Sequence, residues 1–257
     1  MHWIIQDNLI NPATRAQLGT LLESRGVAYT GVRLIPIFDL LDHDAPAVSG
    51  PSFVYGSTGL GNVAKAQGWA PGYYDENLDY ELALKQYGTL ALNSGAVCSS
   101  LLEMPRHFDT FFVRPVLDNK SFAGTVMTWA EFEVFRENIE KITDDQDATL
   151  RLTDRIVVAP LTVIAAEYRF FVIAGQVVTG SLYKAGDEVR SSAHVPPEVW
   201  AFAQHCADTW RPNDAFTLDV ALTAQGPKVI ELNSANSAGF YACDVGAIID
   251  AVNANLS

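Results

Sequence analysis

The sequence has 257 residues, of which 49% are hydrophobic and 18% charged, and 30 acidic residues against 17 Lys and Arg give a net charge of −13. This apolar content excludes a disordered chain, because its burial can offset the entropy lost on ordering. The scarcity of cations argues against a protein that coats nucleic acid or an anionic membrane. The length fits two small domains or one elaborated domain.

Residues 1–8 have no basic region followed by an apolar core, so we expect no secretory signal. No apolar run approaches the roughly 18–20 residues that a membrane span needs. Cys98, Cys206 and Cys243 are odd in number and lie far apart, without the spacing of a metal site. We therefore expect a reduced, cytoplasmic protein that does not act at a membrane.

The first 105 residues predict a small, mostly parallel α/β unit, because strands alternate with helical stretches there. We expect the following elements: strands at 3–6, 32–38 and 52–55, and a helix at 13–25. The third strand leads into the glycine-rich bend Gly-Ser-Thr-Gly-Leu-Gly at residues 56–61. Its spacing matches no phosphate-binding motif, so we interpret it as a loop at the carboxyl end of a strand.

Beyond residue 105 the pattern changes to α+β with antiparallel strands. Helical stretches are expected over about 78–104, and the capping box Thr128-Trp-Ala-Glu131 predicts the start of another helix. The remaining elements are expected to be strands at 110–116, 155–158, 168–174 and 177–183, a helix at 196–210, and a last hairpin of 216–222 and 228–232. We place a domain boundary near residue 105, which divides the chain into domains 1–105 and 106–257.

The last hairpin brings two carboxylates together. Alternation places Asp219 opposite the apolar face of its strand, while Glu231 and Asn233 share a face of the next strand. A three-residue turn centred on Gln225 would make Asp219 and Glu231 direct cross-strand neighbours. Like charges in that position destabilise a sheet, and a divalent cation such as Mg²⁺ would explain them. A two-residue turn would shift the register and remove the argument, and two exposed acidic side chains are the alternative.

Two arginines, Arg114 and Arg169, occur inside apolar strand-like segments. A buried guanidinium is costly unless an anion pairs with it. Glu167 lies two residues before Arg169 on the same face, so one alternative is that these two side chains simply pair. Arg114 and Lys120 have no such local partner. In a sequence with few cations, five of them could together bind a polyphosphate: Arg114, Lys120, Arg169, Lys184 and Arg190.

Residues 110–242 resemble the ATP-grasp superfamily, specifically the phage and bacterial clade named for conserved arginines and a lysine. The resemblance rests on the order and spacing of these segments: 112–124, 167–172, 178–183, 219–221 and 229–233. It implies an ATP-grasp fold, in which ATP binds between two α+β lobes with antiparallel sheets. The N-terminal unit is compatible with the family's pre-ATP-grasp domain.

The resemblance also implies roles for single residues. Arg114 and Lys120 would bind phosphate, and Arg169 would face the γ-phosphate or the acyl phosphate. The metal positions are matched by Asp219, Glu231 and Asn233. The other nucleotide-binding positions, at and after the linker that receives adenine, are Val158, Ala159, Pro160, Leu161 and Glu167. Lys184 and Arg190 would contact phosphate or an acidic substrate.

By the same resemblance, we expect an Mg²⁺-dependent ligase that uses ATP to join a carboxylate to an amine through an acyl phosphate and releases ADP and phosphate. The substrate would be a small molecule, an amino acid or a peptide. Residues 234–241 either line the acceptor site or form a loop into the last helix. The alternatives are an inactive ATP-binding module and a kinase that phosphorylates a small molecule or a protein.

Overall fold

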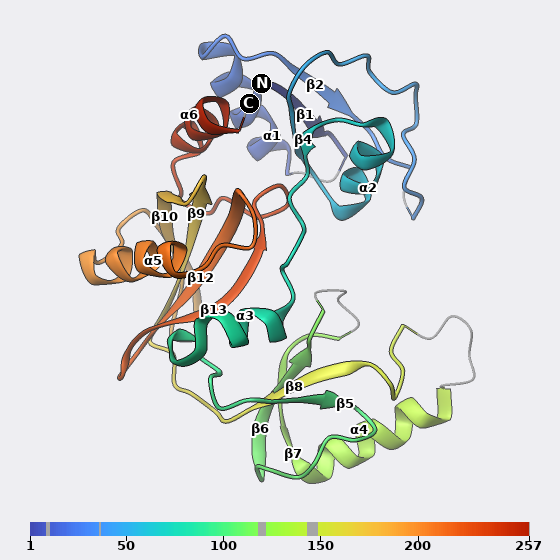
Figure 1. Cartoon of the computed structure of the whole chain (residues 1–257), viewed down its shortest axis with the longest axis vertical. Helices are drawn as coiled ribbons and strands as arrows, with labels where there is room; N and C mark the ends of the chain where they lie inside the picture. Colours follow the sequence, from blue (N-terminus) through green and yellow to red (C-terminus); the bar gives the residue numbers. More distant parts are fainter. Residues whose placement is uncertain (9–10, 36, 118–121, 143–148, 257) are drawn as a thin grey trace.

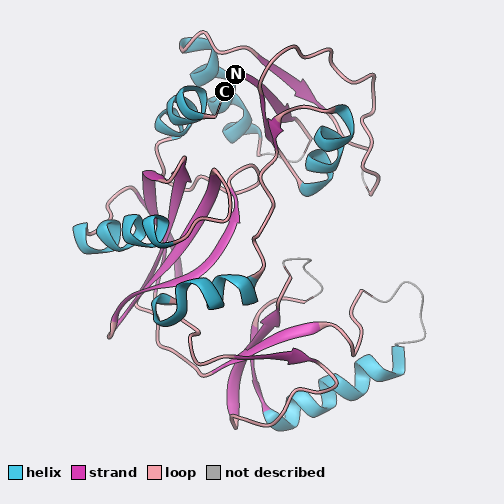
Figure 2. Ribbon diagram, viewed as in Figure 1, coloured by secondary structure: helices cyan, strands magenta, loops and turns pink. Residues whose placement is uncertain are grey.

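The computed structural model describes residues 1–8, 11–35, 37–117, 122–142 and 149–256, and these residues form three sheets (Figures 1 and 2). The N-terminal unit lies at the top of Figure 1, beside the C-terminal helix. A five-stranded sheet occupies the middle, and a four-stranded sheet lies below it. Lys120, a predicted phosphate ligand, lies outside the described residues.

The N-terminal sheet is parallel, with the strand order β2-β1-β3-β4. The elements of this unit are β1 (His2–Gln6), α1 (Pro12–Ser24), β2 (Tyr29–Val32), β3 (Ser52–Tyr55), α2 (Thr58–Gln67) and β4 (Pro71–Gly72). A parallel α/β unit was predicted here, and the sheet confirms it.

Two local predictions in this unit were wrong. The second strand is β2 rather than 32–38, because pairing with β1 uses the segment before the apolar run and leaves Ile37 exposed. The glycine-rich bend is not all loop, since helix α2 begins within it at Thr58 and the Ser57 side chain caps the helix. Serine is a preferred N-cap residue, and the glycines around it hid that signal.

The five-stranded sheet has the order β11-β10-β9-β12-β13, and all its pairs are antiparallel. Its strands are β9 (Ala166–Ile173), β10 (Gln176–Ala185), β11 (Glu188–Ser192), β12 (Ala215–Thr223) and β13 (Gly226–Ser234). Helices α3 (Tyr80–Tyr87) and α5 (Pro197–Thr209) pack on one face, against buried side chains such as Phe170 and Leu218. The apolar face predicted for residues 216–222 is therefore confirmed.

The four-stranded sheet has the order β5-β8-β6-β7, and one helix packs on it. Its elements are β5 (Val97–Ser100), β6 (Thr110–Pro115), β7 (Thr125–Thr128), α4 (Trp129–Ile142) and β8 (Arg155–Ala159). The capping box is confirmed, because the Thr128 N–H donates to Glu131 Oε2 at 2.7 Å and the Glu131 N–H donates to Thr128 Oγ1 at 3.3 Å.

The predicted helical stretch over 78–104 is wrong in its second half. It contains α3, the short 3₁₀ helix η1 (Gly88–Leu90) and then β5, which pairs with β8. The pairing strand lies far along the chain, so periodicity within the segment could not reveal it. Strand β5 precedes the boundary predicted at residue 105 but belongs to the sheet that follows it. The division into two domains stays a prediction.

The N-terminal unit shares a core with the end of the chain. Trp3 and Phe53 of its sheet belong to the same buried cluster as Ile248 of α6 (Val245–Asn255) and Phe171 of β9. The unit therefore packs on the five-stranded sheet at the face opposite α3 and α5. In the described ranges, no helix combines the length and apolar character needed to cross a membrane.

Candidate active site

Three neighbouring strands place three charged side chains in one row. In the sheet register, Arg169 of β9 faces Asp219 of β12, and Asp219 faces Glu231 of β13. Residues at one level of a sheet point to the same face. Asn233, two residues after Glu231, lies on that face as well. The predicted neighbourhood of the two carboxylates is thus confirmed.

This register does not arise from the predicted three-residue turn. Thr223 pairs with Gly226, so only two residues separate the strands. The register then shifts between Val220 and Asp219, because Ile230 is an extra residue in β13 that has no partner in β12. This β-bulge restores the pairing of Asp219 with Glu231 that the two-residue turn alone would remove.

Arg169 and Asp219 form a bidentate ion pair. Nε donates to Oδ1 at 2.8 Å and Nη2 donates to Oδ2 at 2.7 Å. Asp219 is 1% exposed, and burial raises the pKa of its carboxyl to about 6 although Arg169 opposes the rise. Burial also acts to lower the pKa of Arg169, but the charge of Asp219 more than offsets this, so that pKa is raised.

Glu167 does not pair with Arg169, so that alternative was wrong. It accepts instead from Lys184 Nζ at 3.0 Å and from the Tyr183 hydroxyl at 2.7 Å. The Tyr183 ring stacks on Tyr241, with centroids 5.1 Å apart, and the Arg169 guanidinium lies 5.3 Å from the Tyr241 centroid. The guanidinium also lies 5.8 Å from the Tyr183 centroid, so cation–π contacts with both tyrosines add to the hydrogen bonds that hold Arg169 on Asp219.

Arg114 joins the two antiparallel sheets. It extends from β6, and its Nη1 donates to Glu231 Oε2 at 2.6 Å. Asn233 Nδ2 donates to the other oxygen of Glu231 at 3.1 Å. Burial acts to raise the pKa of the Glu231 carboxyl, but Arg114 and Asn233 outweigh burial, and the pKa is lowered. The Arg114 guanidinium also lies 4.3 Å from the ring centroid of Tyr80 in α3.

A cavity of about 500 Å³ adjoins these pairs, and we name it the inter-sheet cavity. Its lining includes Arg114, Phe122, Gly124, Glu167, Tyr183 and Glu231. A predicted phosphate ligand, a predicted nucleotide-binding residue and a predicted metal ligand thus border one space between the two sheets. Sequence reasoning missed Tyr80 and Tyr183, because an aromatic residue that packs on a distant arginine leaves no local pattern.

The other predicted site residues are distributed as follows. Val158 and Ala159 are buried in β8, whereas Pro160 and Leu161 are exposed where the chain passes from β8 to β9. This segment does link the two sheets, as the linker prediction requires. Arg190 is exposed on the edge strand β11 and forms no ion pair within the described ranges. The roles of these five residues stay predictions.

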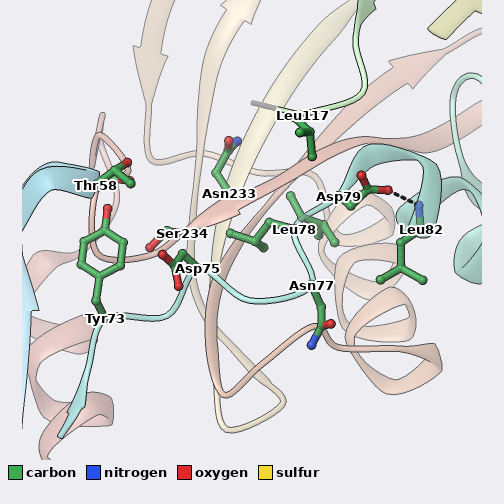
Figure 3. A pocket seen from close by; sticks show the side chains of 12 residues that line it. Thr58, Tyr73, Asp75, Asn77, Leu78, Asp79, Leu82, Leu117, Asn233 and Ser234 are labelled. Atoms are coloured by element: carbon green, nitrogen blue, oxygen red, sulfur yellow. Dashed lines mark hydrogen bonds between the residues drawn. The ribbon is translucent and has the colours of Figure 1, made fainter. Parts of the chain in front are cut away.

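A second cavity of about 640 Å³ lies at the end of β13, and we name it the β13-end cavity (Figure 3). It is bordered by Thr58 of α2, by Tyr73, Asp75 and Asp79 from the segment before α3, and by Asn233. Leu117 borders both cavities. Because Asn233 and Leu117 lie in its wall, a molecule in the β13-end cavity would have one end beside a predicted metal ligand.

The predicted metal ligands Asp219, Glu231 and Asn233 fit a hard divalent cation only in part. Among the described residues, no group of three His, Cys, Asp or Glu side chains could hold a metal. Asp219, Glu231 and the Asn233 amide supply oxygen ligands on one face, and Mg²⁺ commonly uses one or two carboxylates together with phosphate and water. The set therefore suits Mg²⁺ that arrives with a polyphosphate, provided that the two arginines release the carboxylates.

Comparison with known proteins identifies the family. The model of an ATP-grasp domain, the third family of the clade named for its arginines and lysine, matches residues 42–252. The chain belongs to this family. The predicted membership of the ATP-grasp superfamily and of this clade is confirmed. No protein of curated function has a significant match to the sequence.

Solved structures show the same fold. D-alanine–D-alanine ligase from Bacillus anthracis has a TM-score of 0.59 at 12% identity, and the match covers 100% of this chain and 94% of that one. The ATP-grasp ligase PsnB has a TM-score of 0.60 at 14% identity, with 98% of both chains covered. A RimK domain protein from Sphaerobacter thermophilus DSM 20745 has a TM-score of 0.61 at 12% identity, with 92% of both covered. The predicted ATP-grasp fold is confirmed, whereas the pre-ATP-grasp assignment of the N-terminal unit stays a prediction.

Proposed function

We propose that the chain is an ATP-dependent carboxylate–amine ligase. The observation that carries this proposal is the row of Arg169, Asp219 and Glu231, which meets Arg114 of the other sheet beside the inter-sheet cavity. The structures that share the fold support it, since they include a D-alanine–D-alanine ligase and a ligase, PsnB, complexed with a precursor peptide and AMPPNP. An amino acid or a peptide is accordingly the proposed substrate.

In the proposed reaction, a carboxylate oxygen of the acid attacks the γ-phosphorus of ATP, the bond to ADP breaks, and an acyl phosphate forms. The amine nitrogen then attacks the acyl carbon. The carbon–oxygen bond to phosphate breaks, phosphate leaves, and the nitrogen loses a proton as the amide forms. Phosphoryl transfer depends mostly on positioning and on charge stabilisation, so no protein nucleophile is required.

The arginines and carboxylates would exchange partners when nucleotide binds. Asp219, Glu231 and Asn233 would hold Mg²⁺, which would neutralise charge on the phosphates. Arg114 and Arg169 currently pair with the carboxylates, so each guanidinium would turn to a phosphate or acyl-phosphate oxygen as its carboxylate takes the ion. The exchange leaves no buried charge unpaired. The remaining proposed contacts are Lys120 to phosphate, Lys184 and Arg190 to phosphate or substrate, and the segment 158–161 to adenine.

The test is to incubate the protein with ATP, Mg²⁺ and a panel of amino acids and peptides. We expect ADP and phosphate to be released only with a true substrate pair, together with a product whose mass is that of the two substrates less one water. Asp219→Asn should lower this turnover at least about 100-fold, because it removes a charge from the metal set. Asp187→Asn, in the exposed turn after β10, is the matched control and should be unaffected.

The products also separate the alternatives. AMP release would indicate adenylation, and a stable phosphorylated product would indicate a kinase. Nucleotide binding without turnover on any acceptor would indicate a binding module. Absence of nucleotide binding by the wild-type protein would refute the proposal altogether.

A further inference from the structure

The β13-end cavity differs in charge from the inter-sheet cavity. Arg114 borders the inter-sheet cavity, whereas no Lys, Arg or His is among the described residues that border the β13-end cavity. Within the described part of its wall, the charged groups are the carboxylates of Asp75 and Asp79. Among the residues that the structure describes, the wall of this cavity thus offers an anion carboxylates and hydroxyls but no cationic side chain.

The two carboxylates are not equivalent. Both oxygens of Asp75 accept from Lys65 Nζ, at 2.8 and 2.9 Å, so its charge is already compensated. Asp79 forms no ion pair with any residue the structure describes. Its Oδ1 accepts from the Leu82 N–H at 2.8 Å and caps helix α3 (Figure 3). The cap uses one oxygen, and the other accepts no hydrogen bond from the residues that the structure describes. Asp79 also borders a smaller cavity together with Arg155, whose charge interacts with it over a distance longer than an ion pair.

The rest of the wall combines apolar and hydroxyl groups. Four leucines contribute apolar surface: Leu78, Leu82, Leu117 and Leu232. At the other end of the cavity, Tyr73 is 7% exposed, and its hydroxyl lies near the hydroxyls of Thr58, Ser234 and Ser237. Figure 3 shows the Tyr73 hydroxyl pointing toward Thr58. Such a wall can bury a hydrocarbon skeleton and also hydrogen-bond a neutral polar group.

We infer that the β13-end cavity binds the amine substrate as a cation, with its ammonium group on Asp79 and an apolar skeleton against the leucines. The substrate class is a primary amine on an apolar carbon skeleton, such as an amino acid or peptide N-terminus with an apolar side chain. A charge-assisted hydrogen bond to a partly buried carboxylate is stronger than a neutral one. This inference rests on the proposed function, because it names the amine of that reaction.

Three probes that share the leucine skeleton but differ in charge test the inference. They are leucinamide, which is a cation, N-acetylleucinamide, which is neutral, and N-acetylleucine, which is an anion. Their dissociation constants for the full chain with Mg²⁺ are measured by NMR titration, with and without AMPPNP. We expect leucinamide to bind, and N-acetylleucine to bind at least about tenfold more weakly, which corresponds to about 1.4 kcal/mol.

The variant Asp79→Asn removes the charge and keeps the helix cap, because Asn caps helices as well as Asp does. It should weaken leucinamide binding at least about tenfold and leave N-acetylleucinamide unchanged. The matched control is Asp244→Asn, another N-cap aspartate, which caps α6 outside the cavity and should leave all three probes unchanged.

Three results would overturn the inference: no binding of leucinamide, equal binding of leucinamide and N-acetylleucine, or equal loss in the two variants. The titration needs no turnover. Failure to release ADP with any substrate, or failure to bind AMPPNP, would refute the proposed function and leave the probe series to decide the inference separately.

Discussion

At the scale of single residues, the site consists of charges that compensate one another. Asp219 is almost fully buried, and its ionised form is stabilised by the two hydrogen bonds from Arg169. The pKa of Asp219 is nevertheless raised, so folding favours its protonated form, and this contribution to stability is lost as the pH rises through about 6. The site thus holds a carboxylate at a cost to stability that a bound cation could relieve.

The first prediction concerns this pair. Arg169→Met leaves a buried carboxylate without its partner, and breaking a buried pair typically costs about 3–5 kcal/mol of unfolding free energy. The double variant Arg169→Met, Asp219→Leu removes both charges and should lose much less. Urea unfolding followed by tryptophan fluorescence measures the unfolding free energy of both variants and of the wild type.

The control for this comparison is an exposed pair. Arg33 and Asp42 are 60% and 41% exposed, so Arg33→Met should cost less than about 1 kcal/mol. Equal losses in the single and double variants at Arg169 would show that the side chain contributes by packing and not by charge.

At the scale of elements, the hairpin of β12 and β13 positions the predicted metal ligands. Gly226, the first residue of β13 after the two-residue turn, has a left-handed backbone with a φ of +93°, and the bulge at Ile230 then corrects the register. Alternation along each strand could be read from the sequence, so the faces of Asp219, Glu231 and Asn233 were predicted correctly. The turn length and the bulge could not be read from the sequence, because each depends on how the two strands pair.

The second prediction follows from the turn. Gly226→Ala should destabilise the protein by about 1 kcal/mol, because an L-residue is strained at positive φ. Nothing lies within 4 Å of the added Cβ, so the backbone conformation alone would account for the loss. Thermal and urea unfolding measure it.

Gly239→Ala is the matched comparison. Its added Cβ also meets nothing within 4 Å, and its φ is not in the left-handed region, so no loss of stability is expected. If both variants behave alike, the backbone at Gly226 accepts an L-residue without strain.

At the scale of the whole molecule, one buried asparagine connects the N-terminal unit to the end of β13. Asn236 is fully buried, and its Nδ2 donates to the carbonyls of Val54 and Gly72. Its Oδ1 accepts from the Tyr74 N–H at 2.9 Å. These bonds position one wall of the β13-end cavity relative to the other.

The third prediction is that Asn236→Ala costs about 3 kcal/mol or more, because it leaves buried backbone groups unpaired at roughly 1–3 kcal/mol each. Urea unfolding gives the loss, and Asn138→Ala, on the exposed face of α4, should change stability by less than about 0.5 kcal/mol. A small loss at Asn236 would mean that the two parts hold together by apolar packing alone.

The sequence by itself determined the fold class, the family and which face of each strand carries the charged residues. These depend on alternation, on the order of segments and on composition, all of which can be read along the chain without knowing which segments meet in space. The alternative that Glu167 pairs with Arg169 was wrong although both residues lie on the expected face, because proximity along one strand does not decide which partner a charge takes across the sheet.

Only the tertiary structure decided which side chains and which strands contact each other. Arg114 meets Glu231, Tyr80 meets Arg114, and β5 joins β8, although the members of each pair lie far apart in sequence. The same holds for the β13-end cavity, whose wall is assembled from α2, the segment before α3 and the end of β13. Such contacts form because separate elements bury their apolar faces together, and the energy that selects them belongs to the packed molecule and not to any one segment.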